Sequence, residues 1–401
     1  MKRLLLLGGS AQQVIAIETA KKLGYYTILC DYLTDNPGQY VADKFYLVST
    51  TDKTAVLEVA EKEHVNGIIA YASDPAAPTA AYVAEQLNLC TNPYRSVDIL
   101  CNKDKFRKFL SKNGFDCPIA KSYSSTESAI NEKNCFDYPI IIKPVDSSGS
   151  KGVTILKTPK GFEDAVNFAF SFSRSKKIII EKFIICKYKQ TIGGDIFIDN
   201  GKVIIWGLMN CFREHSPNPL VPGGEIFPAL LNDKDLEKVK FVLQNLVTKL
   251  NIQSGCMNVE LMIDKDDKVY LIDIGPRAGG NMIPIQLSAI FGVDIVKMSI
   301  LSAMGEKLDF TPHIEIPYCS HYVLHSNVDG IYQNIIFSEE IEKNIFRKEL
   351  YKKPGDRVEC FDNAAKALGI IFLKFSSANE MYYKMNHMDD YIKIILKGKL
   401  S

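Results

Sequence analysis

Two carboxylates and one arginine at the end of an apolar segment have the types and spacing of a metal and phosphate site. The segment KVYLIDIGPRAGGN, residues 268–281, carries Asp273 within a strand pattern and Arg277 after a Gly-Pro break. The preceding segment CMNVELMI carries Glu260, and the two segments are predicted to pair as one hairpin. Facing carboxylates repel each other unless a cation lies between them, and Mg²⁺ prefers carboxylates together with nucleotide phosphates.

The planar guanidinium of Arg277 suits bidentate binding of a phosphate group. Two alternatives stay open at this hairpin. Glu260 and Asp273 would each pair with a separate basic residue, and Arg277 would form an ordinary surface salt bridge.

A second candidate site is the segment IIIKPVDSSGSKGV, residues 140–153. Lys143 ends an apolar strand pattern, where a buried lysine is costly unless it meets an anion. Small residues then free backbone N–H groups to approach a polyphosphate. The loop joins two predicted strands and lacks the GxxxxGK[ST] pattern before a helix, so it is no Walker P-loop. The alternative is a flexible hairpin tip with a solvated lysine.

The elements that must position these residues divide the chain into three regions. Residues 1–92 alternate short apolar strands with helical patterns, which indicates a parallel, doubly wound sheet. Residues 93–310 are dominated by hairpins, and residues 311–401 show short strands followed by a helix from Asn379. We therefore expect an α/β (α+β) protein with three domains over these ranges.

The first region contains a feature that is typical of dinucleotide sites. Gly8 and Gly9 follow a strand and open a helix, and Asp31 ends the next strand, as a ribose-binding acid would. The pattern GGSAQQ lacks the third glycine that close helix–strand packing requires. We favour a tight turn with an open helix N-terminus in a Rossmann-like scaffold.

Composition narrows the class of protein. The chain has 401 residues, 46% hydrophobic and 24% charged, with a formal net charge of +1. These values indicate a globular protein and give no indication of nucleic-acid or membrane binding. Its ten cysteines form no CxxC pair, and MKRLLLLGGS is too short for a signal-peptide core. We expect a cytoplasmic protein, with a homodimer as a compatible state.

Taken in chain order, these segments resemble the ATP-grasp superfamily, above all carboxylate–amine and amino-acid ligases and the related carbamoyl-phosphate synthetases and biotin carboxylases. The resemblance covers most of the chain and rests on the Rossmann-like front region and the segments NKDKFRKFL, YPIIIKP with SSGSKGV, IIIEKFI, NVELMI and YLIDIGPRAGGN. It implies two antiparallel sheets that clamp ATP, one of them a lid at about residues 116–182. A Rossmann-like domain would precede them, and a C-terminal α+β extension would follow.

Most of the roles that this resemblance implies concern the nucleotide. Two lysines would contact ATP phosphates, the Gly/Ser loop would form a mobile lid, and the segment EKF would be the hinge beside adenine. No acid after the hinge matches the usual ribose contact, and Gln190 or Asp195 would replace it. The nucleotide set is Lys105, Lys143, Ser147, Ser148, Gly149, Ser150, Gly152, Glu181, Lys182, Phe183 and Gln190.

The implied metal and catalytic residues match the two segments that open this section. Glu260 and Asp273 would bind Mg²⁺, with Mn²⁺ as the alternative, and Arg277 and Lys143 would stabilise the transferred phosphoryl group. Gly275 departs from the pattern, because many relatives have an Asn ligand there. Water or bound phosphates would have to complete the metal shell.

Substrate contacts are expected from loops. Arg213 and His215 in CFREHSPNPL would bind a substrate carboxylate, although a histidine without a role is an equal alternative. Asp74 in YASDPAAP would assist an amino group, but we favour a helix cap there.

Three functions are compatible with these residues. The first is an ATP-dependent carbon–nitrogen ligase that phosphorylates a carboxylate, plausibly that of an amino acid, and then joins it to an amine. The second is a carbamoyl-phosphate synthetase or biotin carboxylase type of enzyme that uses bicarbonate. The third is a non-catalytic ATP-binding protein. We favour the ligase, with small-molecule carboxylate and amine substrates, no nucleic-acid or membrane partner, and a homodimer as a compatible state.

Overall fold

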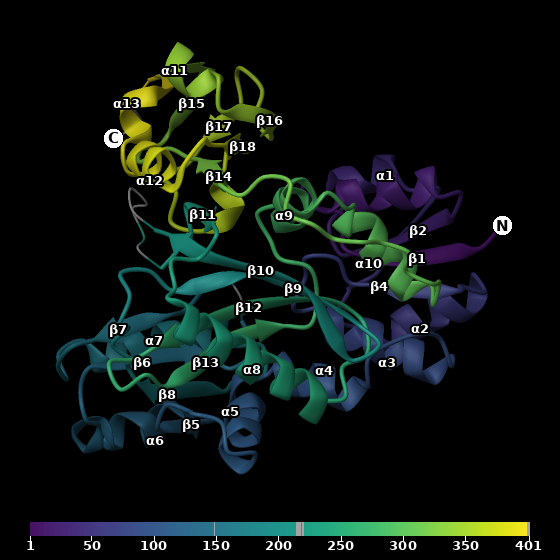
Figure 1. Cartoon of the computed structure of the whole chain (residues 1–401). Coiled ribbons are helices and arrows are strands. Elements are labelled where there is room, and N and C mark those ends of the chain that lie inside the picture. The colour runs from purple at the N-terminus through teal and green to yellow at the C-terminus, as the bar shows by residue number, and fades with distance from the viewer. Residues whose placement is uncertain (148, 214–217, 219, 399–401) are drawn as a thin grey trace.

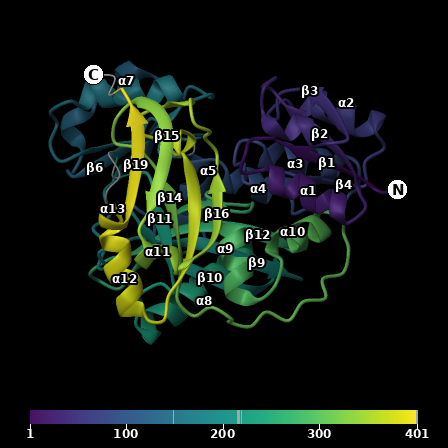
Figure 2. The same ribbon diagram turned by 90° about the horizontal axis from the view of Figure 1, so that it is seen from above.

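The computed structural model describes residues 1–147, 149–213, 218 and 220–398, and within them the chain forms four β-sheets with helices packed around them. In Figure 1 the front region lies at the right, the C-terminal region at the top and the predicted lid at the lower left. A long central sheet connects the three. Figure 2 shows from above that the front sheet and the C-terminal strands lie on opposite sides of the molecule.

The front sheet is parallel, with the strand order β3-β2-β1-β4. Its strands are β1 (Arg3–Leu7), β2 (Tyr26–Asp31), β3 (Lys44–Leu47) and β4 (Gly67–Ile69). The helices around it are α1 (Val14–Lys22), α2 (Lys53–Lys62), α3 (Ala77–Gln86), α4 (Tyr94–Leu100) and a 3-10 turn (Pro37–Tyr40). The predicted parallel sheet is confirmed. Strand β3 lacks a sequence signal, because KFYL is a short and partly exposed edge strand.

The Gly8-Gly9 turn is packed against the chain itself. The backbone N–H of Gly9 donates to Asp31 Oδ2 at 2.7 Å, and Asn36 donates to the same oxygen. A Cβ atom on Gly38 would lie 2.7 Å from the Cα atom of Gly9. The 3-10 turn thus occupies the space beside the glycines, which supports the interpretation of this loop as a tight turn.

The sheet of the predicted lid is antiparallel, with the order β5-β8-β6-β7. Its strands are β5 (Ala120–Tyr123), β6 (Ile140–Pro144), β7 (Thr154–Leu156) and β8 (Ile178–Lys182). The helices of this region are α5 (Lys103–Lys112), α6 (Thr126–Asn131) and α7 (Phe162–Phe172), with a 3-10 turn (Lys133–Cys135). The hairpin predicted around the Gly/Ser loop is confirmed as β6 and β7.

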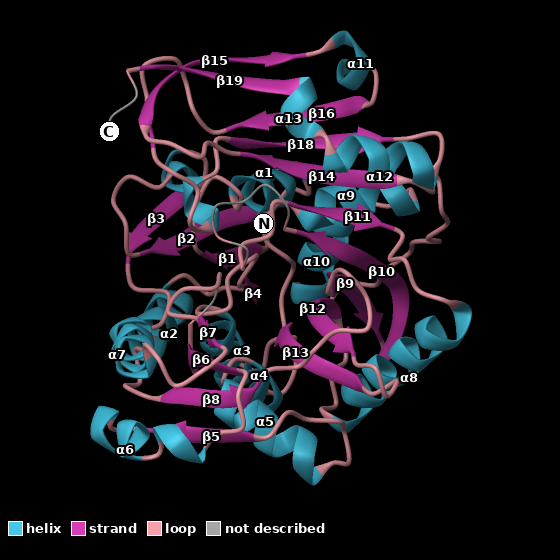
Figure 3. Cartoon of the chain, turned by 90° about the vertical axis from the view of Figure 1, so that its left-hand side faces the viewer, coloured by secondary structure: helices cyan, strands magenta, loops and turns pink. Residues whose placement is uncertain are grey.

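The central sheet has eight antiparallel strands in the order β13-β12-β9-β10-β11-β14-β18-β16 (Figure 3). Its first five strands in the chain are β9 (Ile192–Asp199), β10 (Lys202–Phe212), β11 (Gly224–Phe227), β12 (Gly255–Ile263) and β13 (Val269–Gly275). Helices α8 (Asp233–Lys249), α9 (Ile283–Phe291) and α10 (Ile295–Ala303) belong to the same region. The predicted hairpin of Glu260 and Asp273 is confirmed as β12 and β13, and β9 and β10 form a second hairpin. Asn200 and Gly201 adopt the positive φ angles that a tight hairpin turn requires.

The C-terminal region continues the central sheet and adds a small sheet of its own. Strands β14 (Cys319–Leu324), β16 (Ile345–Leu350) and β18 (Gly369–Lys374) extend the central sheet. The small sheet has the order β17-β15-β19, formed by β17 (Arg357–Val358), β15 (Gly330–Phe337) and β19 (Ile392–Lys397). The helices are α11 (Glu339–Glu342), α12 (Ala378–Asn386) and α13 (Met388–Tyr391), with a 3-10 turn (Ala364–Lys366). The helix predicted from Asn379 is α12.

The site lies on a rigid support. One face of β9, β12 and β13 packs on α8 through a core of aliphatic side chains that includes Leu243, Leu246, Ile196, Val259 and Leu271. Burying such side chains contributes roughly 1.5–3 kcal/mol each. The opposite face of these strands carries polar residues, which the next section describes.

In the described residues, no single helix could span a membrane by length and apolar composition, and only the pair α9 and α10, bent by 110°, passes that test together.

Candidate active site

Glu260 and Asp273 lie opposite each other on β12 and β13, as the sequence predicts. Each has its own basic partner. Arg213 Nη2 lies 2.7 Å from Glu260 Oε1, and Lys103 Nζ lies 3.3 Å from Asp273 Oδ2. The two acids keep side-chain exposures of 31% and 45%, so a ligand can reach both. The alternative of separate basic partners is therefore the observed arrangement.

The donor set fits a magnesium ion that is bound together with a nucleotide. Among the described residues, no group of three His, Cys, Asp or Glu side chains is arranged to hold a metal ion. Mg²⁺ is commonly held by one or two carboxylates, with phosphates and water as its other ligands. Burial would raise the pKa of Asp273, but the charges of Lys103, Lys143 and Arg107 outweigh it and hold this pKa below its usual value. The carboxylate is therefore ionised and ready to bind a cation.

Lys103, and not Lys105, is the lysine beside the acid pair. Helix α5 begins at Lys103. The ammonium group of Lys103 also donates to the carbonyl of Ser147 at 3.1 Å. Lys105 lies two residues further on, which places it on a different side of the helix. Its ammonium pairs with Asp98 at 2.5 Å and is half exposed. The structure thus places Lys103, and not Lys105, beside Asp273, and the predicted contact of Lys105 with ATP phosphates stays a prediction.

Lys143 is buried in a network of charges behind the acid pair. Its Nζ atom lies 2.8 Å from Glu181 Oε2, and Arg107 Nε lies 2.8 Å from Glu181 Oε1. Arg107 also donates to the carbonyls of Leu271 and Ile272 on β13. Burial would raise the pKa of Glu181, but Arg107 and Lys143 lower it to about 2. The carboxylate of Glu181 thus holds both basic residues in place.

The Gly/Ser loop has a backbone shape that suits an anion. Gly149, Ser150 and Gly152 all adopt left-handed φ angles, between 60° and 75°. In a turn that contains such residues, successive backbone N–H groups can form an anion-binding concavity. Ser150 Oγ donates to the carbonyl of Leu220 at 2.8 Å, which connects this loop to the loop after β10. Ser148 lies outside the described residues.

The predicted hinge is formed largely by backbone contacts. The backbone N–H of Phe183 donates to the carbonyl of Pro139 at 3.0 Å. The ammonium of Lys182 pairs with the carboxylate of Asp137, so its side chain is engaged outside the acid pair. Gln190 lies in the loop between β8 and β9, and its proposed ribose contact remains a prediction.

Arg277 and Asp74 bind each other across the boundary between the front region and the central sheet. Arg277 Nε lies 2.7 Å from Asp74 Oδ1, and Arg277 Nη2 lies 2.5 Å from Asp74 Oδ2. Helix α3 has Ala76 as its N-cap, with no side-chain cap, so the favoured expectation that Asp74 caps a helix is wrong. The phosphate role of Arg277 and the amine role of Asp74 would require this pair to open or to act as a unit.

The structure gives a steric reason for a glycine, and not an asparagine, at position 275. A Cβ atom at this position would lie 2.5 Å from Asp74 Oδ1 and 3.0 Å from Arg277 Cζ. The space that an Asn side chain would fill is therefore occupied by the Asp74–Arg277 pair.

Gly275→Ala is expected to destabilise the protein by about 1 kcal/mol, because the added methyl group displaces the side-chain ends of Asp74 and Arg277 from their ion pair. Gly280→Ala is the matched control, since a Cβ there meets only Gln12 Oε1, at 3.9 Å. Chemical denaturation of both variants checks the expectation. Equal unfolding midpoints for the two variants would contradict it.

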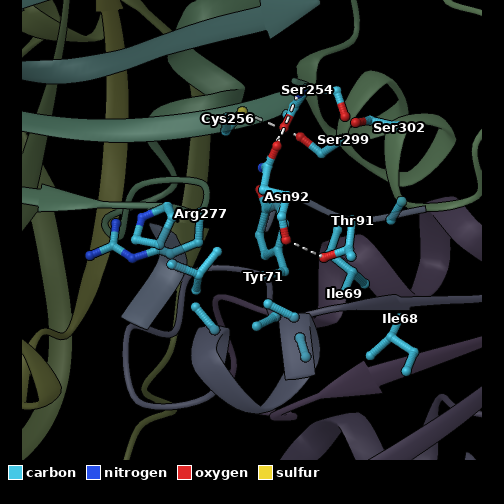
Figure 4. Close-up of a pocket in the computed structure, with 18 of the residues that line it drawn as sticks. Ile68, Ile69, Tyr71, Thr91, Asn92, Ser254, Cys256, Arg277, Ser299 and Ser302 are labelled. Carbon is cyan, nitrogen blue, oxygen red and sulfur yellow. Dashed lines mark hydrogen bonds between the residues drawn. The ribbon is translucent and has the colours of Figure 1, made fainter. Parts of the chain in front are cut away.

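A small cavity adjoins the backbone of the Arg277 loop (Figure 4). It has a volume of about 110 Å³ and lies between the front region and the central sheet. Tyr71, Asn92, Cys256 and Ser299 line it, and Asn92 donates to the carbonyl of Ser254 at 2.8 Å. These contacts tie the front region to β12, which carries Glu260.

Several site residues lack a clear sequence signal. Lys103 and Arg107 lie in KDKFRKFL, where four of eight residues are basic and none stands out. Arg107 shares the buried side of α5 with Phe106 and Leu110, and an arginine on an apolar face is the signal that could have identified it. Asp195, the alternative to Gln190 for the ribose contact, is buried on β9, where Asn258 Nδ2 and the backbone of Gly279 donate to it, and its ribose contact stays a prediction.

Of the two residues that were predicted to bind a substrate carboxylate, the structure describes one. Arg213 lies beside the acid pair, where its Nη1 atom also donates to Thr191 Oγ1 at 2.6 Å. His215 lies outside the described residues.

Comparison with known proteins agrees with this fold. Residues 102–311 match the model of the family described as carbamoyl-phosphate synthase L chain, ATP binding domain. This match covers just over half of the chain, and the chain belongs to this family of the ATP-grasp superfamily. The carbamoyl phosphate synthase large chain of Thermotoga petrophila is 27% identical over 292 residues, which are 71% of this chain and 26% of that protein. The chain thus spans about a quarter of the length of this relative.

Two solved structures share the fold over nearly the whole chain. The L-amino acid ligase from Bacillus licheniformis has a TM-score of 0.82 at 22% identity and covers 99% of both chains. The biotin carboxylase domain of 2-oxoglutarate carboxylase from Hydrogenobacter thermophilus, in complex with MgADP, ADP and bicarbonate, has a TM-score of 0.75 at 16% identity. It covers 98% of this chain and 91% of that domain. At these identities the likeness shows a common fold, and the predicted ATP-grasp fold is confirmed.

Proposed function

We propose that the protein is an ATP- and Mg²⁺-dependent ligase that activates a carboxylate as an acyl phosphate for attack by an amine. The observation that carries the proposal is the facing pair of Glu260 and Asp273, with basic side chains on both sides. Phosphoryl transfer requires little covalent chemistry from a protein, but it requires cations positioned around the moving phosphoryl group. This arrangement supplies both the carboxylates for a metal ion and the cations.

Each residue has a distinct part in this proposal. Glu260 and Asp273 would hold Mg²⁺, which supplies charge neutralisation at the ATP phosphates when it is bound. Lys103 and Lys143 would bind the phosphates from the side of the predicted lid. Arg277 would bind the transferred group once it separates from Asp74. We assign the phosphate contact to Lys103 in place of Lys105, because only Lys103 lies beside Asp273.

The reaction would proceed in two steps. A carboxylate oxygen of the acid substrate attacks the γ-phosphorus of ATP, and the bond from this phosphorus to the β–γ bridging oxygen breaks, which releases ADP. The amine nitrogen then attacks the acyl carbon, the carbon–oxygen bond to phosphate breaks, and the amine gives up a proton. The Gly/Ser loop would exclude water, since an acyl phosphate hydrolyses on contact with it.

A bicarbonate-using enzyme is the second candidate, because the matching family model is that of the carbamoyl-phosphate synthase L chain. In that case bicarbonate would take the place of the organic acid as phosphoryl acceptor.

The test is release of ADP and phosphate in the presence of ATP, Mg²⁺ and pools of amino acids and amines. We expect release that requires two organic substrates and that stops when EDTA removes Mg²⁺. Release that depends on bicarbonate would favour the second candidate. Tight ATP binding without turnover in any pool would contradict both.

A further inference from the structure

A groove lies where the front region, the central sheet with its helices and the C-terminal region meet. Figure 1 shows α9 between α1 and the strands of the C-terminal region. Helix α1 forms one wall of the groove, the end of α9 and the start of α10 form its floor, and β16 forms the opposite wall. The groove has a volume of about 890 Å³, which is the size of a site for a small organic molecule. None of its lining residues belongs to the candidate active site.

The surface of the groove is mainly apolar. Its apolar lining residues are Ile15, Leu23, Ile285, Ala289, Val293, Val296 and Phe346. Four of them, one or more on each side of the groove, are only partly buried: Ile15, Leu23, Val293 and Phe346. A ligand with an apolar body would remove this surface from water, which favours binding in proportion to the area that is covered.

Three basic side chains line the same groove: Lys22, Lys297 and Arg347. Neither lysine forms an ion pair with a described residue, and the Lys297 ammonium lies 5.6 Å from the centre of the Phe310 ring. Arg347 donates from Nε to Glu349 Oε1 at 2.7 Å, and its two terminal nitrogens donate to no residue in the described part of the chain. The cations of the groove are thus available to an anionic ligand, which would form charge-assisted hydrogen bonds with them.

The other polar side chains of the groove add to this preference. Asp294 Oδ1 already accepts from the backbone N–H of Lys297 at 2.9 Å, and Glu315 Oε1 lies 3.3 Å from His313 Nε2. Thr19 on α1 is only 8% exposed, and its hydroxyl has no hydrogen-bond partner among the described residues. A buried hydroxyl is nearly always paired, so this donor is complementary to an oxygen of a ligand. The acids are engaged, whereas the cations and one hydroxyl are not.

We propose that this groove binds an amphipathic organic anion, with its apolar body on the floor and its acid group paired with the basic side chains. The inference is independent of the ligase proposal, because the two sites share no residue. A ligand here would contact all three regions of the chain at once. Since α9 continues from the loop that carries Arg277, the occupied groove would adjoin the active site without being part of it.

Other occupants fit the groove less well. Inorganic phosphate would pair with the cations but would leave the apolar surface in contact with water. An uncharged apolar molecule would cover that surface but would leave the cations without an anion. In a twofold dimer through this face the same surface would meet itself, and a surface whose unpaired charges are all positive is not self-complementary.

The first experiment measures the affinity of the wild-type protein for octanoate, octanol and acetate by isothermal titration calorimetry. Octanol keeps the apolar body without the charge, and we expect it to bind at least about 10-fold more weakly than octanoate. Acetate keeps the charge without the chain, and since each methylene group contributes about 4-fold, we expect no measurable binding. Absence of octanoate binding, or equal affinities for octanoate and either analogue, would overturn the inference.

The second experiment locates the octanoate with variants of the full chain. Each partly exposed ion pair contributes up to about 5-fold, so the double variant Lys22→Gln, Lys297→Gln should raise the Kd for octanoate about 5- to 25-fold. Lys21→Gln is the matched control, because Lys21 precedes Lys22 on α1 but its ammonium lies 2.9 Å from Asp43 and does not line the groove. We expect the wild-type Kd for this control. Equal values for the double variant and the control would overturn the inference.

A third variant, Ala289→Phe, fills the floor of the groove and keeps its charges. We expect it to weaken octanoate binding at least about 10-fold, since the added ring takes the place of the apolar body. All variants should keep the wild-type affinity for a non-hydrolysable ATP analogue, which shows that they are folded. Analytical ultracentrifugation tests the competing occupant. A dimer that Ala289→Phe dissociates, together with no binding of octanoate, would assign the groove to a second copy of the chain and overturn the inference.

Discussion

Asp273→Asn is expected to lower kcat for ADP release at least about 100-fold, while the protein stays folded. The substitution keeps the shape of the side chain but removes the negative charge that would bind Mg²⁺ opposite Glu260. Even outer-shell partners of metal ligands typically change affinity or activity 10- to 100-fold when they are replaced, and a direct ligand should change it more. Because Asp273 is 45% exposed, the free energy of unfolding should change little.

The measurement is steady-state ADP release at saturating ATP as a function of Mg²⁺ concentration. Asp266→Asn is the matched control, because Asp266 lies exposed in the turn of the same hairpin. We expect wild-type kcat for this control and a higher Mg²⁺ requirement for Asp273→Asn. Wild-type activity of Asp273→Asn would exclude this residue as a metal ligand.

Arg107→Met is expected to lower the free energy of unfolding by about 3–5 kcal/mol. In the structure the carboxylate of Glu181, which is 3% exposed, pairs with Arg107 and Lys143. The substitution removes the first of these partners and leaves the second. Breaking a buried ion pair costs this much because a charge is left incompletely compensated. Arg107 also satisfies two carbonyls of β13, which the methionine cannot replace.

Equilibrium denaturation in urea measures this effect, with Arg95→Met on the exposed surface of α4 as the control. An unfolding free energy equal to that of the control would show that the buried network contributes nothing.

The loss of unfolding free energy at acid pH gives a second measurement of the same network. The pKa of Glu181 is about 2 in the folded protein, below the ordinary value of 4.5. Stability from this group is therefore fully present above about pH 4.5 and is lost as the pH falls toward 2. In Arg107→Met, with its largest opposing charge removed, this pKa should rise, so the loss of stability between pH 4.5 and 2 should be smaller than in the wild type.

The sequence predicted the elements well where hydrophobic periodicity and turn residues agree. The hairpin that pairs Glu260 with Asp273 follows from two apolar runs around an acidic turn, and their register then fixes which residues face each other. The edge strand β3 could not be predicted, because its four residues have neither alternation nor turn residues on both sides.

At the site, the residue types were predictable but their partners were not. A basic motif such as KDKFRKFL does not indicate which lysine faces the acids, because this depends on where α5 begins. The partner of Arg277 comes from a loop about 200 positions earlier in the chain, and no local pattern indicates such a contact.

The fit of Gly275 against Asp74 has a consequence for comparing sequences of this superfamily. The glycine at position 275 and the acid at position 74 belong together. The Asp74–Arg277 pair fills the space that a side chain at position 275 would need. A gain of Asn at the first position requires the Asp74–Arg277 pair to move, or a smaller residue at the second position. The residues at positions 275 and 74 should therefore covary among homologues. Together they would divide the relatives into proteins with a third metal ligand and proteins with an ion pair to the front region.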